Sequence, residues 1–307
     1  MNKTSTDGLS VVIPCHNSGA LVREAVDSVL LQSLSFPYEV IVVDDGSDDL
    51  ATRTALDSVA AVSDVRIVRL PGNQGAQAAR TAGLESAEFD YILPLDCDDR
   101  LATGPELLKH GSYPEQAVRI LRSAPGVAFA HTFSRMFGDF QGFTISAYPA
   151  HESLLVRKHH APMSIVYRRA DGLAAGGYDR RIRKWQDWAF AIDLLAARHR
   201  REAVNEVACV PGPFHEYRVH NHFPRLSVAE VSESTMTRLV VEKNLAYFRS
   251  HLGDGSAEAL TALVCANKPD RLTDLLYMAA SDLNQAVMLA RERGVSWSSH
   301  TDALGVP

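Results

Sequence analysis

Short apolar runs alternate with amphipathic segments along the first hundred residues. Four runs are rich in Val, Ile and Leu, as buried parallel strands are: Leu9–Pro14, Tyr38–Val43, Val65–Leu70 and Tyr91–Leu95. Between them, apolar residues recur at helical spacing from Leu21 onward and over 49–59 and 75–86. Either Asn17 or Ser18 is expected to cap the first helix. This alternation predicts an α/β fold with right-handed crossovers and a parallel, doubly wound sheet.

The pattern becomes less regular after about residue 102. The sequence predicts, in order, a helix at Tyr113–Ser123, a long strand at Val127–Phe137, a binding loop or lid over 138–162, a strand at Ser164–Tyr167, a glycine turn at 176–177, a helix at Asp187–Arg198 and a strand at Ala203–Val210. Apolar spacing then predicts one long helix over Val228–Ser250 and two or three shorter ones over 255–293. We therefore expect a domain of residues 1–227, with halves 1–100 and 101–227, and a helical region of residues 228–307.

The composition is that of an ordinary globular protein, and it narrows the choice of partners. Hydrophobic residues make up 46% and charged residues 22% of the 307 positions, and the net charge is −6. No local basic patch stands out, so nucleic acid and anionic membranes are not expected partners. No stretch approaches the roughly 18 apolar residues of a membrane-spanning helix, and the first residues lack the apolar core of a signal peptide. The expected location is therefore cytoplasmic.

The four cysteines, Cys15, Cys97, Cys209 and Cys265, are scattered without a C-x-x-C pair. This spacing argues against a zinc ribbon, a redox dithiol or a disulfide framework, so we expect buried thiols. The chemistry of the protein must then come from other residue types.

Polar residues follow each of the four N-terminal strands. They read Pro14-Cys-His-Asn17, Asp44-Asp-Gly-Ser47, Pro71-Gly-Asn-Gln-Gly75 and Asp96-Cys-Asp-Asp99. In open α/β sheets, ligands bind beyond the carboxyl ends of the strands. We therefore expect these four segments to meet in one acidic, amide-rich crevice.

Acidic residues after the second and fourth strands are candidates for ligand and metal binding. In extended geometry Asp96 and Asp98 point the same way, and two carboxylates can hold a hard divalent cation whose open positions accept phosphate oxygens. The alternative is a polar turn whose aspartates cap a helix. Asp44 or Asp45 can accept a hydrogen bond from the imide N–H of uracil or from ribose hydroxyls, unless the pair only forms an Asp-Gly turn.

The helix after the third strand begins with glycine and carries an arginine. Backbone amides at Asn73–Gly75, together with the positive end of the helix, suit a diphosphate or a base, and Arg80 follows one or two turns later. The alternative is a surface arginine on an ordinary helix.

Together, these segments resemble the nucleotide-binding half of family 2 glycosyltransferases, which are inverting enzymes with a GT-A fold. The matching text is Val11–Asn17, Val42–Ser47, Asn73–Gly75 with Arg80 and Gly83, and Leu95–Asp99, and the resemblance extends over about residues 9–227. It implies a Rossmann-like, mixed GT-A sheet, a nucleoside diphosphate sugar as donor and Mg²⁺ or Mn²⁺ as cofactor. By the same resemblance Asp98 and Asp96 hold the metal, and the donor is contacted by Pro14, Asn17, Asp44, Asp45, Asn73, Arg80 and Asp96. Thr81 departs from the family pattern, which usually has asparagine there.

A sugar transferase also needs a base, because an acceptor hydroxyl is a weak nucleophile until its proton leaves. The family places this carboxylate on a later helix, and the segments Gly176–Asp179 and Lys184–Trp188 resemble that region. The resemblance makes Asp187 the expected base, while Gln186 stands where glutamate is common. The structural alternative makes Asp187 a helix N-cap and the tryptophans beside it core aromatics.

A second histidine-containing stretch resembles the family further along the chain. The segment Glu216-Tyr-Arg-Val-His220 matches its tyrosine-arginine-x-histidine pattern. By that resemblance His220 joins the metal ligands or touches the diphosphate, and Arg218 offsets the charge of the leaving group. A structural role for the histidine is the alternative. His151, His159 and His160 are interpreted as loop residues near the acceptor.

The sequence as a whole predicts a metal-dependent, inverting hexosyl- or N-acetylhexosaminyltransferase that uses a UDP-linked donor and an acceptor hydroxyl or amine. Two other classes stay open: a nucleotidyl- or phosphotransferase with the same acidic residues, and a non-catalytic binder of nucleotide sugars. The lack of a G-x-x-x-x-G-K-[ST] loop disfavours the first of these, and the lack of a G-x-G-x-x-G after any strand disfavours a dinucleotide-dependent oxidoreductase. The C-terminal helices are expected to pack on the core or to form a homodimer.

Overall fold

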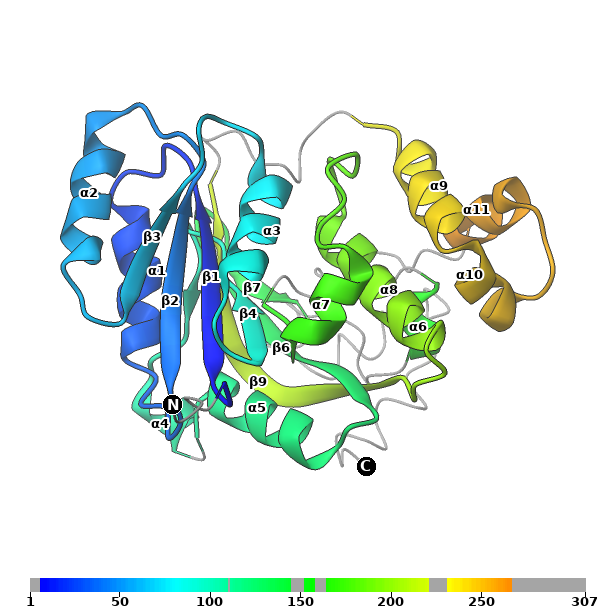
Figure 1. Ribbon diagram of the computed structural model, residues 1–307, viewed down its shortest axis with the longest axis horizontal. Helices are drawn as coiled ribbons and strands as arrows, with labels where there is room; N and C mark the ends of the chain where they lie inside the picture. Colours follow the sequence, from blue (N-terminus) through cyan, green and yellow to red (C-terminus); the bar gives the residue numbers. More distant parts are fainter. Residues whose placement is uncertain (1–5, 110, 145–151, 158–163, 221–230, 267–307) are drawn as a thin grey trace, which may run out of the picture.

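A computed structural model describes residues 6–109, 111–144, 152–157, 164–220 and 231–266. Its centre is a mixed sheet with the strand order β3-β2-β1-β4-β8-β6-β9-β5, and β7 pairs with β6 (Figure 1). The strands are β1 Leu9–Cys15, β2 Tyr38–Asp44, β3 Val65–Arg69, β4 Tyr91–Pro94, β5 Arg100–Leu101, β6 Val127–Gly138, β7 Gly142–Thr144, β8 Val166–Arg168 and β9 Glu206–Val219. The helices are α1 Leu21–Leu30, α2 Leu50–Ala60, α3 Ala76–Ser86, α4 Pro105–Leu108, α5 Tyr113–Ser123, α6 Glu152–Leu155, α7 Arg169–Ala175, α8 Gln186–His199, α9 Glu233–Lys243, α10 Leu245–Leu252 and α11 Ala257–Ala266.

The first four strands run parallel, which brings their carboxyl ends to one edge of the sheet. β1 pairs in parallel with β2 on one side and with β4 on the other, and β2 pairs in parallel with β3. The register sets Cys15 opposite Asp44, and Asp44 opposite Arg69. The loops that follow these strands therefore start side by side. Beyond β4 the sheet is mixed, because β8 runs antiparallel to both β4 and β6 while β6 and β9 are parallel.

Helices cover both faces of the sheet, as the predicted doubly wound arrangement requires. On one face, alternate residues of β1 such as Val11 pack with buried residues of α1, α2 and α5. On the other face, Val12 and Ile41 pack with α3, α7 and α8. The alternation of side chains along each strand thus supplies two separate hydrophobic cores.

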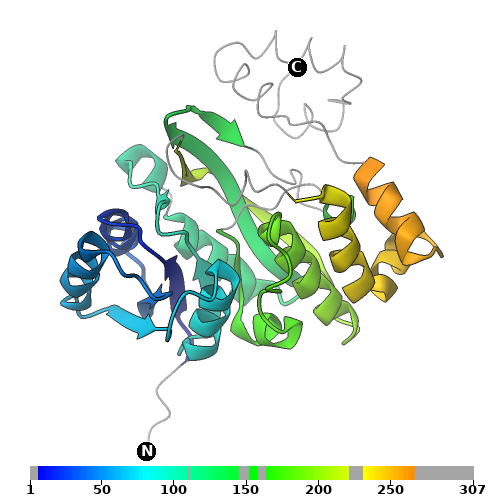
Figure 2. The same ribbon diagram turned by 90° about the horizontal axis from the view of Figure 1, so that it is seen from above.

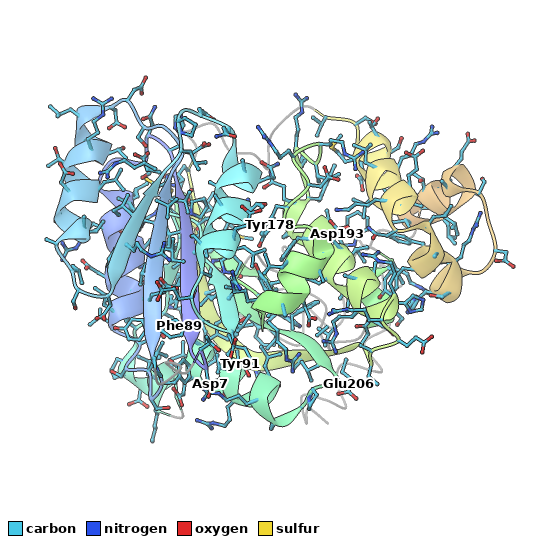
Figure 3. All side chains as sticks on the ribbon, viewed as in Figure 1. Asp7, Phe89, Tyr91, Tyr178, Asp193 and Glu206 are labelled. Atoms are coloured by element: carbon cyan, nitrogen blue, oxygen red, sulfur yellow. The ribbon has the colours of Figure 1, made fainter. Side chains whose placement is uncertain are left out.

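The C-terminal helices α9, α10 and α11 lie at the end of the molecule away from α1 and α2 (Figures 1 and 2). Val240, Val241 and Phe248 are buried in the same core as α8. Asp193, labelled in Figure 3, lies on the side of α8 that faces α9 and accepts hydrogen bonds from the Lys243 ammonium at 2.8 Å and the Asn244 amide at 2.7 Å. The helical C-terminal region predicted from the sequence is therefore present, and it packs on the sheet domain.

Some predicted elements were wrong in detail. The expected single helix over Val228–Ser250 begins at Glu233 and is divided at Asn244, whose backbone leaves the helical range and whose side chain bonds Asp193 instead. Helix α1 begins after Ala20 without a side-chain cap, because Asn17 turns away to bond Asp48. Strand β9 runs on to residue 219. Directly before the glycine turn lies the short helix α7, which the sequence pattern does not predict.

The predicted domain boundary lies outside the described residues, and the predicted loop over 138–162 is described only in part. The predicted boundary at residue 227 lies outside the described residues, so the division into 1–227 and 228–307 stays a prediction. The stretch 138–162 contains β7 and α6 within its described parts.

Among the cysteines, Cys15 is buried as predicted, but Cys97, Cys209 and Cys265 are partly exposed, and all four are free thiols. No helix in the described ranges combines the length and apolar character needed to cross a bilayer.

Candidate functional site

The acidic segment after β4 forms a turn that gathers three carboxylates. The backbone amide of Asp99 donates to the Asp96 carbonyl at 3.0 Å, so the segment is not extended as predicted. The turn nevertheless brings carboxylate oxygens of Asp96, Asp98 and Asp99 within 4.8 Å of one another. Burial, together with the charges of Asp99 and Asp96, raises the pKa of Asp98 to about 7. A divalent cation would relieve this repulsion, and carboxylate oxygens are the ligands that Mg²⁺ and Mn²⁺ prefer.

Asp99 differs from the other two carboxylates because it is buried and already engaged. One of its oxygens accepts from the backbone amide of Arg218 at 2.7 Å, and the other lies 3.2 Å from Nε2 of His215. The other ring nitrogen of His215 lies 2.8 Å from the Ser134 hydroxyl. Asp99 therefore fastens the acidic turn to β9 and β6. The side chains of Asp96 and Asp98 are 25% and 39% exposed, so these two carboxylates are the ones open to a ligand.

The predicted Arg218 of β9, and His220 directly after this strand, both reach the acidic turn. Nε2 of His220 lies 3.4 Å from a carboxylate oxygen of Asp98, which is compatible with a shared metal. Arg218 donates from Nε to the Asp98 carbonyl at 2.8 Å and from its terminal nitrogen to Glu24 at 2.5 Å, and its guanidinium lies over the Phe137 ring. These contacts give Arg218 a part in holding the turn, in addition to the charge-offsetting role expected from the sequence.

Arg80 connects the acidic turn to helix α8. Its guanidinium donates to the Asp96 carboxylate at 2.5 Å and to the Gln186 side-chain oxygen at 2.7 Å. It is buried rather than on the surface, and its Nε has no hydrogen-bond partner within the described part of the chain. Burial lowers the pKa of Arg80, but Asp96, Tyr178 and Asp187 together raise it by more, so the net shift is upward. Gln186, where the family often has glutamate, thus serves as a neutral partner for this arginine.

Asp187 lies in the first turn of α8, close enough to Arg80 that its charge also raises the pKa of that arginine. It is half-buried, and it is not the N-cap, because the cap position is taken by Trp185. Trp185 adopts left-handed backbone angles, which cost roughly 1–2 kcal/mol for a residue other than glycine. Trp188 is a core residue whose indole N–H donates to the Leu155 carbonyl at 2.7 Å.

The turn before α8 explains the unusual Thr81. The Thr81 hydroxyl accepts from the backbone amide of Tyr178 at 2.9 Å. Gly177 has a φ of +70°, and a Cβ there would lie 2.7 Å from the Thr81 side chain. Thr81 and Gly177 therefore fix the chain where it leaves the predicted glycine turn and approaches α8. Tyr178, labelled in Figure 3 beside α3, stacks on Phe190 with ring centroids 3.9 Å apart.

The loops after β2 and β3 are held together by Asp45. Its two oxygens accept from the backbone amides of Gln74 and Gly75, each at 2.7 Å. Asp44 accepts from the Ser47 amide at 2.9 Å, and both aspartates are buried. Charge-assisted bonds of this kind are short and strong, so the Asp-Asp pair organises the loops after β2 and β3 whatever else it contacts.

The loop after β1 joins the same assembly. The ring of His16 bridges the Asp45 carbonyl and the Asn73 side chain, with both distances 2.9 Å. The Asn17 amide donates to Asp48 at 2.8 Å, while Pro14 lies buried within β1. His16 was not singled out from the sequence, although it stands inside the first matched motif. His151, His159 and His160 lie outside the described residues.

Comparison with known proteins agrees with this architecture. The family model described as "Glycosyl transferase family 2" matches residues 10–110. The resemblance to glycosyl transferase family 2 is thereby confirmed. Two relatives are similar over a longer range: an uncharacterized glycosyltransferase of Haemophilus influenzae is 27% identical over 61% of this chain, and the uncharacterized glycosyltransferase YwdF of Bacillus subtilis is 29% identical over 66%. The chain spans 62% of the first relative's length and 71% of the second's.

Solved structures identify the fold beyond the segment that the family model matches. The crystal structure of S. aureus TarS residues 1–349 in complex with UDP-GlcNAc superposes with a TM-score of 0.62 and 18% identity, over 87% of this chain and 73% of that one. At this level of identity the likeness concerns the fold. The chain therefore has the GT-A fold, with a curled mixed sheet, that the resemblance led us to expect.

Proposed function

We propose that this protein is a metal-dependent glycosyltransferase that moves a sugar from a nucleoside diphosphate sugar to an acceptor hydroxyl or amine in a single displacement with inversion. The observation that carries the proposal is the acidic turn at the carboxyl ends of the parallel strands, where Asp96, Asp98 and Asp99 gather their oxygens within 4.8 Å. The family match over residues 10–110 supports the reaction class.

The residues around the acidic turn fit a divalent cation. Asp98, Asp96 and His220 would hold it, since two partly exposed carboxylates and an imidazole 3.4 Å from Asp98 form an oxygen-rich donor set. When bound, Mg²⁺ or Mn²⁺ supplies positive charge that offsets the charge developing on the departing diphosphate. Arg218 keeps the turn in place by bonding the Asp98 carbonyl.

The loops of the first four strands are the proposed donor-binding surface. Asp44 and Asp45 offer carboxylates for a nucleobase imide or ribose hydroxyls, and Pro14, Asn17 and Asn73 belong to the same group of loops. Arg80 lies between this surface and α8. We propose a uridine nucleotide as donor, in keeping with the UDP-GlcNAc bound to the structurally similar TarS.

Asp187 is the proposed base that takes the acceptor proton as the hydroxyl or amine attacks the anomeric carbon. Three features support this assignment. The carboxylate is half-buried, it lies in the first turn of α8 and not at the N-cap position, and it is near Arg80, which also contacts the acidic turn. A base in this position is worth about 10²–10⁴-fold in rate.

The test is a donor screen with the purified full chain. UDP-, GDP- and dTDP-sugars are incubated with Mn²⁺ or Mg²⁺ and pooled acceptors, and released nucleoside diphosphate and product masses are measured. We expect metal-dependent release of UDP together with a glycosylated product. Nucleotide binding without any turnover would contradict the proposal and favour a non-catalytic binder, and release of pyrophosphate would favour a nucleotidyltransferase.

A further inference from the structure

A short basic segment, residues 180–184, lies next to the proposed base. Arg180, Arg181, Arg183 and Lys184 occupy four of its five positions, in a chain whose net charge is −6. The three arginines are exposed, and Ile182 between them is 2% exposed. The sequence alone does not mark this segment as a basic patch, because so short a run can be recognised as one only when its exposure and its neighbours are known.

The basic segment is fixed between the donor-side loops and α8. The Arg180 guanidinium donates to the Gln74 carbonyl at 3.3 Å, and the Gln77 side chain of α3 donates to the Ile182 carbonyl at 2.5 Å. Helix α8, which carries Asp187, begins two residues after the segment ends. The backbone is therefore anchored on α3, while the three arginine side chains of the segment are exposed.

Nearby carboxylates neutralise only part of this positive charge. Asp179 pairs with Arg181 at 2.6 Å, and Asp193 of α8 pairs with Lys243 of α9. Glu242 of α9 is taken up by Arg238 on the same helix. Within the described ranges, no carboxylate forms an ion pair with the Arg183 side chain. The segment thus keeps an excess of positive charge between the loop after β3, which Arg180 contacts, and the start of α8.

An aromatic side chain completes this surface. Trp185 follows the basic segment directly, with left-handed backbone angles and an indole that is only partly buried. Lys184 lies with its ammonium 5.0 Å from the centre of that ring. The Trp185 ring packs against the hydrophobic core and keeps the Lys184 ammonium beside it, and strained backbone of this kind clusters at ligand-binding sites.

We propose that residues 180–185 form an acceptor subsite for a hydroxyl compound that bears a phosphate group, an inference that rests on the proposed sugar transfer. Guanidinium forks match the oxygens of carboxylate and phosphate alike, and phosphate is favoured because a phosphate monoester carries about −1.5 to −2 charges at pH 7. The monoester of a soluble metabolite and the singly charged phosphodiester of a lipid headgroup share the anionic oxygens that these guanidinium groups would bind.

The subsite is tested with glycerol 1-phosphate and glycerol as matched probes, titrated calorimetrically into the full chain saturated with UDP and Mn²⁺. We expect binding of the phosphorylated probe only, weakened by salt. The double variant Arg183→Gln with Lys184→Gln should lose about tenfold in affinity for glycerol 1-phosphate. Arg200→Gln, an exposed arginine just beyond the carboxyl end of α8, is the control and should bind as the wild type does.

A second arm separates the two sources of phosphate. Cosedimentation with phosphatidylglycerol vesicles, but not phosphatidylcholine vesicles, that is lost in the double variant would assign the subsite to a lipid headgroup. Absence of such cosedimentation, with glycerol 1-phosphate still bound, would assign it to a soluble phosphate. Equal affinity for both probes, or an unchanged affinity in the double variant while UDP and Mn²⁺ still bind, would overturn the subsite and leave the proposed transfer standing. Loss of UDP and Mn²⁺ binding in the wild type would instead count against the proposed function.

Discussion

The two sides of the proposed site are assembled by different kinds of contact. On the side of residues 9–75, neighbouring loops hold one another directly, as when Asp45 accepts from the backbone amides of Gln74 and Gly75. On the side of residues 80–220, side chains far apart in the sequence are joined in buried or half-buried pairs. Arg80 with Gln186, and Asp99 with His215, are two such pairs at the acidic turn.

Because of this difference, ligand binding and the fixing of loop geometry depend on the same residues on the first side, but on separate residues on the second side. Asp45 both belongs to the proposed donor surface and fixes the loop beside it, so changing it would disturb geometry and binding together. On the second side Asp99 holds the acidic turn while Asp98 remains open to a ligand. Substitutions on the second side can therefore test single roles.

The largest effect is expected at Asp187, which contrasts chemistry on the second side with donor binding on the first. Asp187→Asn should lower turnover by about 10²–10⁴-fold, because the acceptor proton loses its base. Donor affinity should change little, since the loops of residues 9–75 are untouched. Steady-state turnover and UDP titration measure the two quantities, with Glu85→Gln on the exposed face of α3 as control. Normal transfer by Asp187→Asn would show that another group removes the proton.

A large effect on stability is expected at Asp171 of α7, which pairs with Arg198 of α8 at 2.7 Å and with Arg201 just after α8 at 2.6 Å. Asp171→Ala leaves the buried Arg198 guanidinium without a carboxylate partner and should cost about 3–5 kcal/mol in the free energy of unfolding. On the first side the exposed pair Arg23–Asp27 offers a matched control, where Asp27→Ala should cost about 0.5 kcal/mol or less. Urea unfolding gives both values, and similar losses in the two variants would remove the contrast.

The junction between the acidic turn and β9 should show an intermediate effect. His215→Ala removes the partner of Asp99 and should weaken Mn²⁺ binding by about 10–100-fold at saturating UDP. His215→Gln, which retains an N–H group, should recover much of this loss. A variant that is less stable but binds Mn²⁺ normally would reduce His215 to a packing role.

The smallest effect concerns pH and the contact between α6 and α10. Hydrogen bonding to Glu152, 3.2 Å away, raises the pKa of His251. Because the folded-state pKa is raised, the pair stabilises the protein below the ordinary histidine pKa of about 6.5, and the gain is lost as pH rises through the raised value. Both groups are partly exposed, so the contribution should be below about 1 kcal/mol. The difference in unfolding free energy between the wild type and His251→Gln should therefore shrink from about pH 5.5 to about pH 8.5, and a constant difference would contradict the assignment.

The sequence predicted the first side of the site well because its signals are local. Each strand of the first hundred residues is an apolar run followed by polar residues, and parallel pairing alone brings those residues to one edge. The acidic turn was expected at the right place but in the wrong conformation. Chain direction after β4 depends on Asp99, whose partner His215 comes much later in the sequence.

The second side was less predictable because its contacts are set by tertiary structure. Nothing near Thr81 in the sequence shows that it would hold the Tyr178 amide, and nothing near Asn244 shows that Asp193 would draw its side chain out of a helix. The role of Gln186 likewise depends on Arg80 from another helix. The roles of such residues can be recognised only when the three-dimensional positions of both partners are known.

The central claim is that the acidic turn holds a cation that grips the diphosphate of the donor, and calorimetric titration of UDP with and without Mn²⁺ tests it most directly. The account predicts that Mn²⁺ strengthens UDP binding in the wild type, and that Asp98→Asn abolishes this gain while leaving the weaker metal-free binding in place. Equal UDP affinity in the presence and absence of Mn²⁺, or an undiminished gain in Asp98→Asn, would contradict it.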